Sequence, residues 1–440
     1  MMEAIPRRTM LRRGALGAAG LQLAAAGARG DGRTGPRVVV GLIGAGGMGS
    51  AHLRLLAARP DVEVACVCDV DAERLASAAK LVEQGSGRAP AAVRDLRRLL
   101  DDRRIDAVWI ATPDHWHAPA AILALDAGKH VYVEKPCCHN IREGALTAEA
   151  VARSGKHLQV GTQSRSTAVV KDAVDRVRGG AIGEVLVAKA WNSQLRGSIG
   201  KTRPSEPPSQ LDYDLWLGPA PAVPYRSNLL PGVWRWWRDF GCGDMGNDGV
   251  HDLDVACWGL GVETHPSRIA CLGGKSFFDD DQEFPDTQYA VFEYPDAAGP
   301  GRARRLIFEQ RIWSPYVQEG YENGAAFYGT EGVMIIGHTV GWTLYGPKNR
   351  KLAERAGPAD LAAHHDDFLA CVRGESKAPS AGVAVGHRSA ALVHLANIAA
   401  RVGRVLDFDP RAEAILGDAE AAALVSRRYR DGHWAAPPTA

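Results

Sequence analysis

The sequence has little net charge, no long apolar run beyond residue 30 and no recurrent cysteine spacing, and each absence excludes a class of protein. A formal net charge of +1 argues against a general electrostatic role on nucleic acid or on an anionic membrane, because both need a concentrated basic surface. Without a long apolar segment, no transmembrane helix is expected. The eight cysteines match neither paired zinc spacing nor a disulfide scaffold, so most should be reduced and buried.

Residues 1–28 differ in composition from the rest and have the order of features typical of an export signal. Arg7 and Arg8 form a twin-arginine pair, and a weakly apolar stretch rich in Ala and Gly extends from Gly14 to Ala28. The alternative is a basic tail without a targeting function. We predict a twin-arginine signal peptide at 1–28, a linker at 29–36, and export of the folded protein to the periplasm or elsewhere outside the cytoplasm.

From residue 37 to residue 161 short apolar runs alternate with helical patterns. The first run, Val38–Ile43, is almost continuously apolar, as in a strand covered on both faces. Strand–helix alternation predicts a doubly wound parallel sheet. The expected strands are 38–43, 62–68, 107–111, 131–133 and 158–160, and the expected helices are 51–58, 72–83, 95–101, 118–127 and 142–154.

After residue 161 the pattern changes to longer strands with few helices between them, at 185–191, 268–272, 288–294 and 305–311. This pattern predicts a second, α+β domain at 162–362 with a largely antiparallel, open-faced sheet. Residues 363–440 read as a helical tail that packs back on the core. The fold class is therefore α/β followed by α+β, in two domains.

The first strand continues directly into a glycine-rich turn, Gly44–Gly49, that opens a helix. Gly44 allows the tight turn, Gly46 allows a pyrophosphate to approach the backbone, and Gly49 allows close helix–strand packing. Asp69 ends the next strand, where a carboxylate can accept the ribose hydroxyls. Such a carboxylate would repel a 2′-phosphate, which favours NAD over NADP. Asp71 is the other candidate, although we expect it to cap the following helix.

Polar residues also follow the strands expected at 107–111 and 131–133. One group is Thr112–His117, where Pro113 ends the strand, and the other is Glu134 and Lys135. Strand ends on this edge of a parallel sheet face the ligand crevice. His115 and His117 could ligate a metal, but no third ligand stands at a recognisable spacing, so no metal is expected.

These motifs together resemble the Gfo/Idh/MocA family of oxidoreductases, over almost the whole chain from residue 37. The matching segments are Gly44–Gly49, Thr112–His117, Glu134–Pro136, Gln159–Gln163, Asp214–Pro219 and Phe327–Gly332. The resemblance implies that Lys135 lies beside the nicotinamide and the reacting hydroxyl. The cofactor contacts that we predict are Gly44, Ala45, Gly46, Gly47, Met48, Gly49, Asp69, Thr112, Pro113, His117, Glu134, Lys135 and Gln163.

The second domain departs from the family pattern at one position. An aspartate usually stands four residues before a histidine that acts as general base, and here His251 matches while Asn247 replaces the aspartate. An amide can hold an alcohol but cannot take its proton. We therefore predict Lys135, His251 and Asn247 as the catalytic group, with the base role on His251 and with Asp244 or Asp248 as possible substitutes for the missing carboxylate.

Tryptophans and arginines precede this motif in Trp234–Phe240, a composition that suits a sugar. Core packing is the alternative explanation for each tryptophan. The predicted substrate contacts are Trp116, Arg165, Asn192, Trp234, Arg235, Trp236, Asp248 and His251.

Three functions remain open at this point. The first is hydride transfer between NAD and a sugar, polyol or glycoside. The second is a redox-neutral glycosidase or lyase that retains its NAD, which would suit an exported protein. The third is a non-catalytic dinucleotide or sugar sensor, which the presence of Lys135 argues against. We also expect a homo-oligomer.

Overall fold

A six-stranded parallel sheet carries the glycine turn, in a computed structural model that describes residues 37–295, 303–338 and 340–438. Its strand order is β3-β2-β1-β4-β5-β6. Strands β2 and β3 are added on one side of β1, and β4, β5 and β6 are added on its other side. A ligand crevice is expected between β1 and β4, beyond the carboxyl ends of the strands. The strands are β1 (Val38–Ile43), β2 (Val62–Cys68), β3 (Ala91–Val93), β4 (Ala107–Ile110), β5 (His130–Val133) and β6 (Leu158–Val160).

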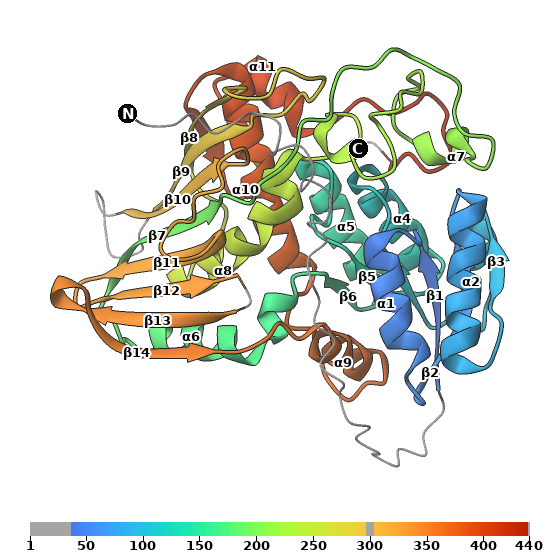
Figure 1. Ribbon diagram of the computed structural model, residues 1–440, viewed down its shortest axis with the longest axis horizontal. Coiled ribbons are helices and arrows are strands. Elements are labelled where there is room, and N and C mark those ends of the chain that lie inside the picture. The colour runs from blue at the N-terminus through green and yellow to red at the C-terminus, as the bar shows by residue number, and fades with distance from the viewer. Residues whose placement is uncertain (1–36, 296–302, 339, 439–440) are drawn as a thin grey trace, which may run out of the picture. The chain divides into compact units, whose positions relative to one another are not determined.

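Helices connect these strands on both faces of the sheet (Figure 1). Gly87 and Gly155 end two of them in the left-handed conformation that favours glycine. The helices are α1 (Gly47–Ala57), α2 (Ala72–Ser86), α3 (Leu96–Leu100), α4 (Asp114–Asp126) and α5 (Ile141–Ser154). This architecture confirms the predicted parallel doubly wound sheet.

The predicted start of α4 was wrong. The sequence pattern placed the helix at 118–127, but it begins at Asp114, directly after Pro113. Its first turn packs inside the protein, and His115 is 0% exposed. Most residues of this turn are polar, so the sequence pattern did not indicate that the turn is buried and helical. The short strand β3 was also missed, because it has only three residues and two of them are exposed.

A ten-stranded sheet follows, in which only β7 and β10 pair in parallel. This confirms the predicted, largely antiparallel sheet. The order is β14-β13-β12-β11-β7-β10-β9-β8-β15-β16. The strands are β7 (Val185–Asn192), β8 (Arg268–Gly274), β9 (Thr287–Pro295), β10 (Ala303–Arg311), β11 (Asn323–Gly329), β12 (Val333–Gly337), β13 (Gly341–Gly346), β14 (Arg350–Ala356), β15 (Leu406–Asp409) and β16 (Ala414–Leu416).

Two helices, α8 (Val250–Leu260) and α10 (Val383–Val402), pack on one face of this sheet and form the largest hydrophobic core with it (Figure 1). Side chains that alternate with the buried ones remain exposed, among them Leu186, Leu272 and Tyr289. Homo-oligomer formation stays a prediction. The remaining helices are α6 (Ala168–Arg178), α7 (Tyr213–Leu217), α9 (Leu361–Val372) and α11 (Ala419–Ala422), with 3-10 turns at η1 (Gln163–Ser166), η2 (Trp234–Trp236), η4 (Pro347–Asn349) and η5 (Ala423–Val425) and a π-helix at η3 (Met245–Gly249).

The C-terminal segment is not purely helical, contrary to the expectation for 363–440. After α10 it adds β15 and β16 to the sheet beside β8. Leu406 and Phe408 are buried and alternate with aspartates, a pattern too short to be recognised among charged residues. Farther on, Arg427 donates to the carboxylate of Glu143 on α5, so the segment reaches back to the first sheet.

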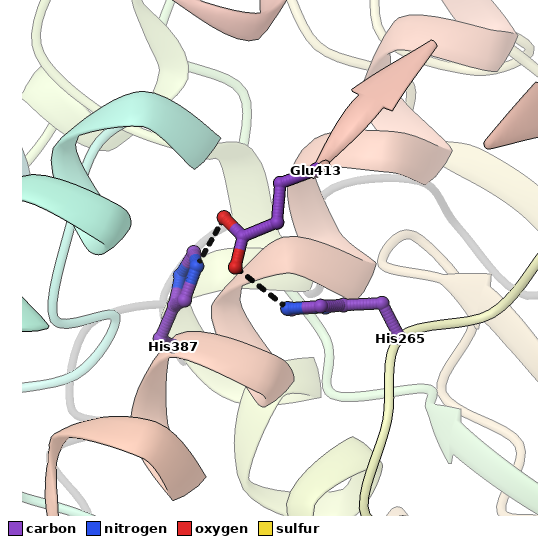
Figure 2. A group of neighbouring side chains, drawn as sticks. All are labelled: His265, His387 and Glu413. Atoms are coloured by element: carbon purple, nitrogen blue, oxygen red, sulfur yellow. Dashed lines mark hydrogen bonds and ion pairs between the residues drawn. The ribbon is translucent and has the colours of Figure 1, made fainter. Parts of the chain in front are cut away.

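A buried ionic group holds this C-terminal hairpin to α10 (Figure 2). Glu413 accepts from His387 Nε2 at 2.8 Å and lies 3.3 Å from His265 Nε2. Although burial opposes ionisation, the two histidines lower the pKa of Glu413 to about 2. Among the described residues, these three side chains are the group whose arrangement could hold a metal ion. Both Nδ1 atoms are buried without a partner, whereas metal-binding histidines usually donate from their second nitrogen.

Within the described ranges, every helix is too short or too polar to span a bilayer. The predicted signal peptide at 1–28 and the linker at 29–36 lie outside the described residues.

Candidate active site

The glycine turn has the shape of a phosphate cradle. Gly44 has a φ of +90°, and a Cβ there would lie 2.7 Å from the Ala111 carbonyl carbon. A Cβ on Gly49 would lie 1.9 Å from the Gly44 oxygen. No side chain caps the start of α1, so its first N–H groups, on Gly47 and Met48, remain available to an anion.

Asp69 lies against this turn from the end of β2. Its carboxylate accepts the Ala45 amide at 2.7 Å and the Asp71 amide at 2.9 Å. Burial raises the pKa of Asp69, while these amides and the nearby Arg74 oppose that rise. Each oxygen keeps a lone pair, so ribose hydroxyls can still donate to it. Asp71 caps α2 through the amides of Glu73 and Arg74, as the sequence predicted.

Arg74 belongs to this site, and sequence reasoning missed it. Its Nη1 lies 3.3 Å from where a Cβ on Gly46 would stand, which places a cation beside the phosphate cradle. The available signal was its position in the first turn of the helix that Asp71 caps.

The residues around the turn fit a dinucleotide. The cradle excludes any side chain at Gly44 and Gly49, and the Thr112 hydroxyl is buried above it without a hydrogen-bond partner. A buried polar atom left in this state is expected to find its partner in a ligand. The Gly44–Gly49 turn, Asp69, Arg74 and Thr112 would hold the adenosine and diphosphate part of NAD.

His117 and Glu134 shape the loops beyond β4 and β5. His117 contacts two backbone oxygens, on Thr112 at 2.8 Å and on Pro136 at 2.6 Å, and so joins the two loops. Glu134 is buried and pairs with His52 Nε2 at 3.0 Å, and His52 Nδ1 lies 2.8 Å from His365 Nε2. Burial opposes ionisation of Glu134, but His52 lowers its pKa, so the carboxylate stays charged.

Lys135 and His251 converge on one place. The Lys135 ammonium donates to the backbone oxygen of Asn247, one turn before His251. Burial lowers the pKa of His251 well below its usual value, and the next largest cause is the charge of Lys135. His251 Nδ1 is buried without a partner, and no hydrogen bond from its ring to the described residues is found. The ring is therefore neutral, with a nitrogen free to accept a proton.

Asn247 is oriented by the carboxylate of Asp244, a contact that the sequence did not predict. Its amide Nδ2 donates to Asp244 Oδ1 at 2.9 Å. Asp244 is 0% exposed and also accepts from Asn192 Nδ2 at 2.9 Å and from Arg196 Nε at 3.1 Å. The side-chain oxygen of Asn247 is thereby left free to accept a hydroxyl of the substrate. Asp244 acts through Asn247, so it does not replace the missing aspartate as a proton acceptor.

Arg196 was not predicted, yet it balances the charge of this region. It donates to Asp244 and pairs with Asp248. Burial opposes ionisation of Asp248, but Arg196 first, and then Lys135, His338 and Arg235, lower its pKa. Asp248 and Asn247 both lie on the π-helix η3, a distortion that often marks a functional site. The only sequence signal for Arg196 was its position shortly after β7.

His338 extends the site from the end of β12 and was also missed. Its ring packs edge-on against His251, with centroids 5.1 Å apart, and its Nδ1 lies 3.1 Å from Asp252 Oδ1. Burial favours the neutral ring, but Asp252 and Asp248 raise the pKa of His338. No sequence pattern indicated this residue.

Several predicted contacts have other partners in the structure. Trp116 is 5% exposed and donates to the backbone of Trp216. Arg165 makes a two-pronged pair with buried Asp254, at 2.7 and 3.0 Å. Trp236 is 4% exposed, inside a hydrophobic cluster. These contacts are sufficient to explain the burial of all three side chains, and their substrate roles stay predictions. Gln163 is half-buried in η1, just after β6, and its cofactor role stays a prediction.

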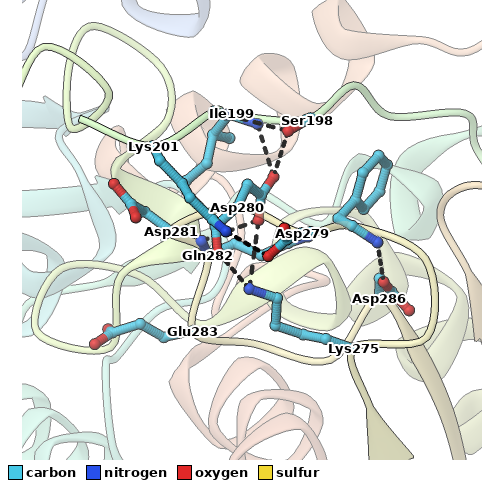
Figure 3. A network of polar contacts seen from close by, with 12 residues as sticks. Ser198, Ile199, Lys201, Lys275, Asp279, Asp280, Asp281, Gln282, Glu283 and Asp286 are labelled. Atoms are coloured by element: carbon cyan, nitrogen blue, oxygen red, sulfur yellow. Dashed lines mark hydrogen bonds and ion pairs between the residues drawn. The ribbon is translucent and has the colours of Figure 1, made fainter.

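A network of polar contacts joins the loop after β7 to the loop between β8 and β9 (Figure 3). Asp280, in the loop between β8 and β9, accepts from the Ser198 hydroxyl and the Ile199 amide, both at 2.9 Å. Glu283 accepts the Arg238 amide at 2.6 Å. The loop after β7, which carries Arg196, and the segment around Trp234 are therefore fixed to a common support.

Comparison with known proteins relates this architecture to nicotinamide enzymes. Residues 38–162 match "Oxidoreductase family, NAD-binding Rossmann fold", and residues 184–297 and 344–435 match "Oxidoreductase family, C-terminal alpha/beta domain", two domains of the Gfo/Idh/MocA group. The chain is 31% identical to "Uncharacterized oxidoreductase YrbE" of Bacillus subtilis (strain 168), over 67% of this chain and 72% of that protein.

Two further similarities are a sequence match over part of the chain and a match of fold. A "Glycosyl hydrolase family 109 protein" of Saccharopolyspora erythraea is 32% identical, but over only 43% of this chain and 46% of that protein. A solved structure of levoglucosan dehydrogenase in complex with NADH superimposes with a TM-score of 0.64 at 21% identity, covering 84% of this chain and 99% of that one. At this identity, the likeness establishes the fold alone.

Proposed function

Because this chain belongs to the Gfo/Idh/MocA oxidoreductase family and has its NAD-binding domain, we propose that it is an NAD-dependent dehydrogenase of a sugar, polyol or glycoside. The observation that carries the proposal is the approach of Lys135 to Asn247 and His251, beyond the carboxyl ends of the parallel strands. A relative named levoglucosan dehydrogenase, which is 30% identical over 50% of this chain, supports a carbohydrate substrate.

In this proposal the residues divide the work on one substrate molecule. The Lys135 ammonium donates to the oxygen of the reacting hydroxyl, and the side-chain oxygen of Asn247 accepts a neighbouring hydroxyl. His251 takes the hydroxyl proton on a free ring nitrogen, which the neutral state of the ring permits. The hydrogen on the same carbon leaves as hydride, and bound NAD supplies the acceptor for it. Lys135 stabilises the negative charge that develops on the oxygen.

Replacement of Lys135 tests this function. The full chain is purified, its NADH binding is measured, and NADH formation is followed with a panel of aldoses, polyols and glycosides. We expect K135M to bind NADH like the wild type but to lose about 10²–10⁴-fold in kcat. The control K171M removes an exposed lysine on α6 and should change neither quantity. Full turnover by K135M would refute the role of Lys135, and NADH binding without turnover of any compound by the wild type would favour a sensor.

A redox-neutral reaction is the second candidate, favoured by the partial match to a glycosyl hydrolase family 109 protein. Oxidation of a ring carbon acidifies its neighbour, so the aglycone can be eliminated, water added, and the carbonyl reduced again with the same cofactor. Turnover without added NAD, with deuterium from D2O entering the neighbouring carbon, would support it. Net NADH formation without deuterium entry would support the dehydrogenase instead.

We also propose export by the twin-arginine route, supported by Arg7, Arg8 and the apolar stretch that follows. Fractionation of cells expressing the full chain tests it: R7K/R8K should keep the protein in the cytoplasm. Equal distribution of variant and wild type would contradict this route.

A further inference from the structure

Arg235 is a cation near the candidate active site that has neither a hydrogen-bond nor an ion-pair partner among the described residues. Its Nε is buried, and no hydrogen bond or ion pair joins its guanidinium to any of the described residues. The group lies over the ring of Trp234, with 5.4 Å between its central carbon and the ring centroid. Arg235 follows Trp234 in the 3-10 turn η2, one of the segments held by the loop network.

The position of Arg235 follows from the charges that act on it. Asp244, Asp114 and Asp248 are within electrostatic range of its guanidinium, and Lys135 acts on Asp114 and Asp248 as well. Gly241, three residues before Asp244, packs on the backbone of Arg235, since a Cβ there would lie 2.4 Å from the Arg235 Cα. Arg235 therefore lies next to the segment that carries Asp244 and Asn247. Asp244 and Asp248 both bind Arg196, and burial raises the pKa of Asp114 and so opposes its ionisation.

Arg196, unlike Arg235, has carboxylate partners. Both arginines are half-buried, and Arg196 donates to two carboxylates. A guanidinium that loses water without gaining such partners is costly, and burial lowers the pKa of Arg235 for that reason. The planar guanidinium fork matches the two oxygens of a carboxylate. A ligand with that group would complete the contacts of Arg235.

We propose that Arg235 binds a carboxylate of the substrate, so that the enzyme acts on an acidic sugar of the uronate or aldonate class. The inference rests on the proposed function, since it adds an acidic group to the carbohydrate that Lys135 and His251 oxidise. A phosphate ester fits less well, because it has close to two negative charges and the carboxylates of Asp114 and Asp248 are near.

The test uses the full chain saturated with NADH and measures ligand binding by calorimetry. The probes are matched pairs, D-glucuronate with D-glucose and D-galacturonate with D-galactose, together with D-glucose 6-phosphate. The variants are R235Q, which removes the charge, R235K, which keeps the charge without the fork, and R203Q. Arg203 is an exposed residue in the loop after β7, so R203Q controls for a general loss of positive charge.

We expect the wild type to bind at least one uronate about tenfold or more tightly than its neutral partner. R235Q should abolish that preference, R235K should keep part of it, and R203Q should keep all of it. Equal binding of acid and neutral sugar, a preference that survives in R235Q, binding of neither member of any pair, or tighter binding of the phosphate would each overturn the inference. NADH binding is scored separately, because its absence would count against the proposed function itself.

Discussion

Asn247 shows why a single uncharged side chain suits this site. Its amide donates to Asp244, a buried carboxylate that Arg196 and Asn192 already approach. An aspartate at this position, as the family pattern has it, would place two carboxylates against each other, and one of them would have to keep a proton. The departure from the pattern is therefore matched to its neighbours.

The N247D variant tests this argument. We expect kcat/KM to fall at least about tenfold at alkaline pH, about 1.4 kcal/mol of transition-state stabilisation, and to recover in part as the pH falls and the new carboxyl is protonated. N247A removes the amide without adding a charge and should lose activity with no such recovery. The pH profiles of kcat/KM for the two variants and the wild type provide the measurement. Wild-type activity of N247D at every pH would show that Asp244 does not constrain this position.

Residue types and strand ends were sufficient to predict some of the site but not all of it. Lys135, His251 and Asn247 were recognised from short motifs, and the structure brings them together. Arg196, Arg74 and His338 were missed, because each contributes through partners that are distant in the sequence. The pair of Arg165 with Asp254 could not be predicted for the same reason, since the two residues are 89 positions apart.

The turn from β1 into α1 depends on glycine at two positions with different neighbours. Gly44 crosses the end of β4, and Gly49 packs on the Gly44 carbonyl. Sequence reasoning identified both, because a strand that runs directly into a glycine-rich helix start imposes these contacts locally. It failed for the start of α4 and for β15, where burial by distant segments decides the structure.

The G49A variant should disrupt this turn. Its Cβ would lie 1.9 Å from the Gly44 oxygen, so the helix and the turn would have to separate. We expect NADH affinity to fall about 100-fold or more and the protein to lose about 1–3 kcal/mol of stability. G274A is the control, because a Cβ on Gly274 in β8 would meet no atom within 4 Å. NADH titration and urea denaturation measure both effects, and unchanged NADH affinity in G49A would contradict this view of the turn.

Buried histidines link the stability of the entire fold to pH. Burial lowers the pKa of His115 to about 3 and that of His394 to about 4, and it also lowers the pKa values of His139 and His365. Below a pH of about 6.5 the unfolded chain protonates these rings while the native chain does not. The unfolded state then binds more protons, so the free energy of unfolding must fall as the pH falls.

Urea denaturation between about pH 7.5 and about pH 5.5 tests this linkage, because the window lies around the ordinary histidine pKa. We expect stability to decrease on acidification, by up to about 1.4 kcal/mol per pH unit for each fully buried neutral ring. H115Q keeps an amide donor with the reach of Nε2 for the Trp216 carbonyl and should reduce that slope by about one proton. A stability that rises on acidification, or an unchanged slope in H115Q, would contradict the assignment of buried neutral rings.

Local steric and periodic rules were enough to establish the two-sheet class, the glycine turn and the strand ends where chemistry could gather, because these features depend on residues close together in the chain. The pairing of charges could not be obtained in that way. Arg196 is neutralised by Asp244 and Asp248, Arg165 by Asp254, and Arg235 by none of the described residues. Folding brings together side chains that no sequence interval relates, and only their distances in space decide which charge is balanced and which is left for a ligand.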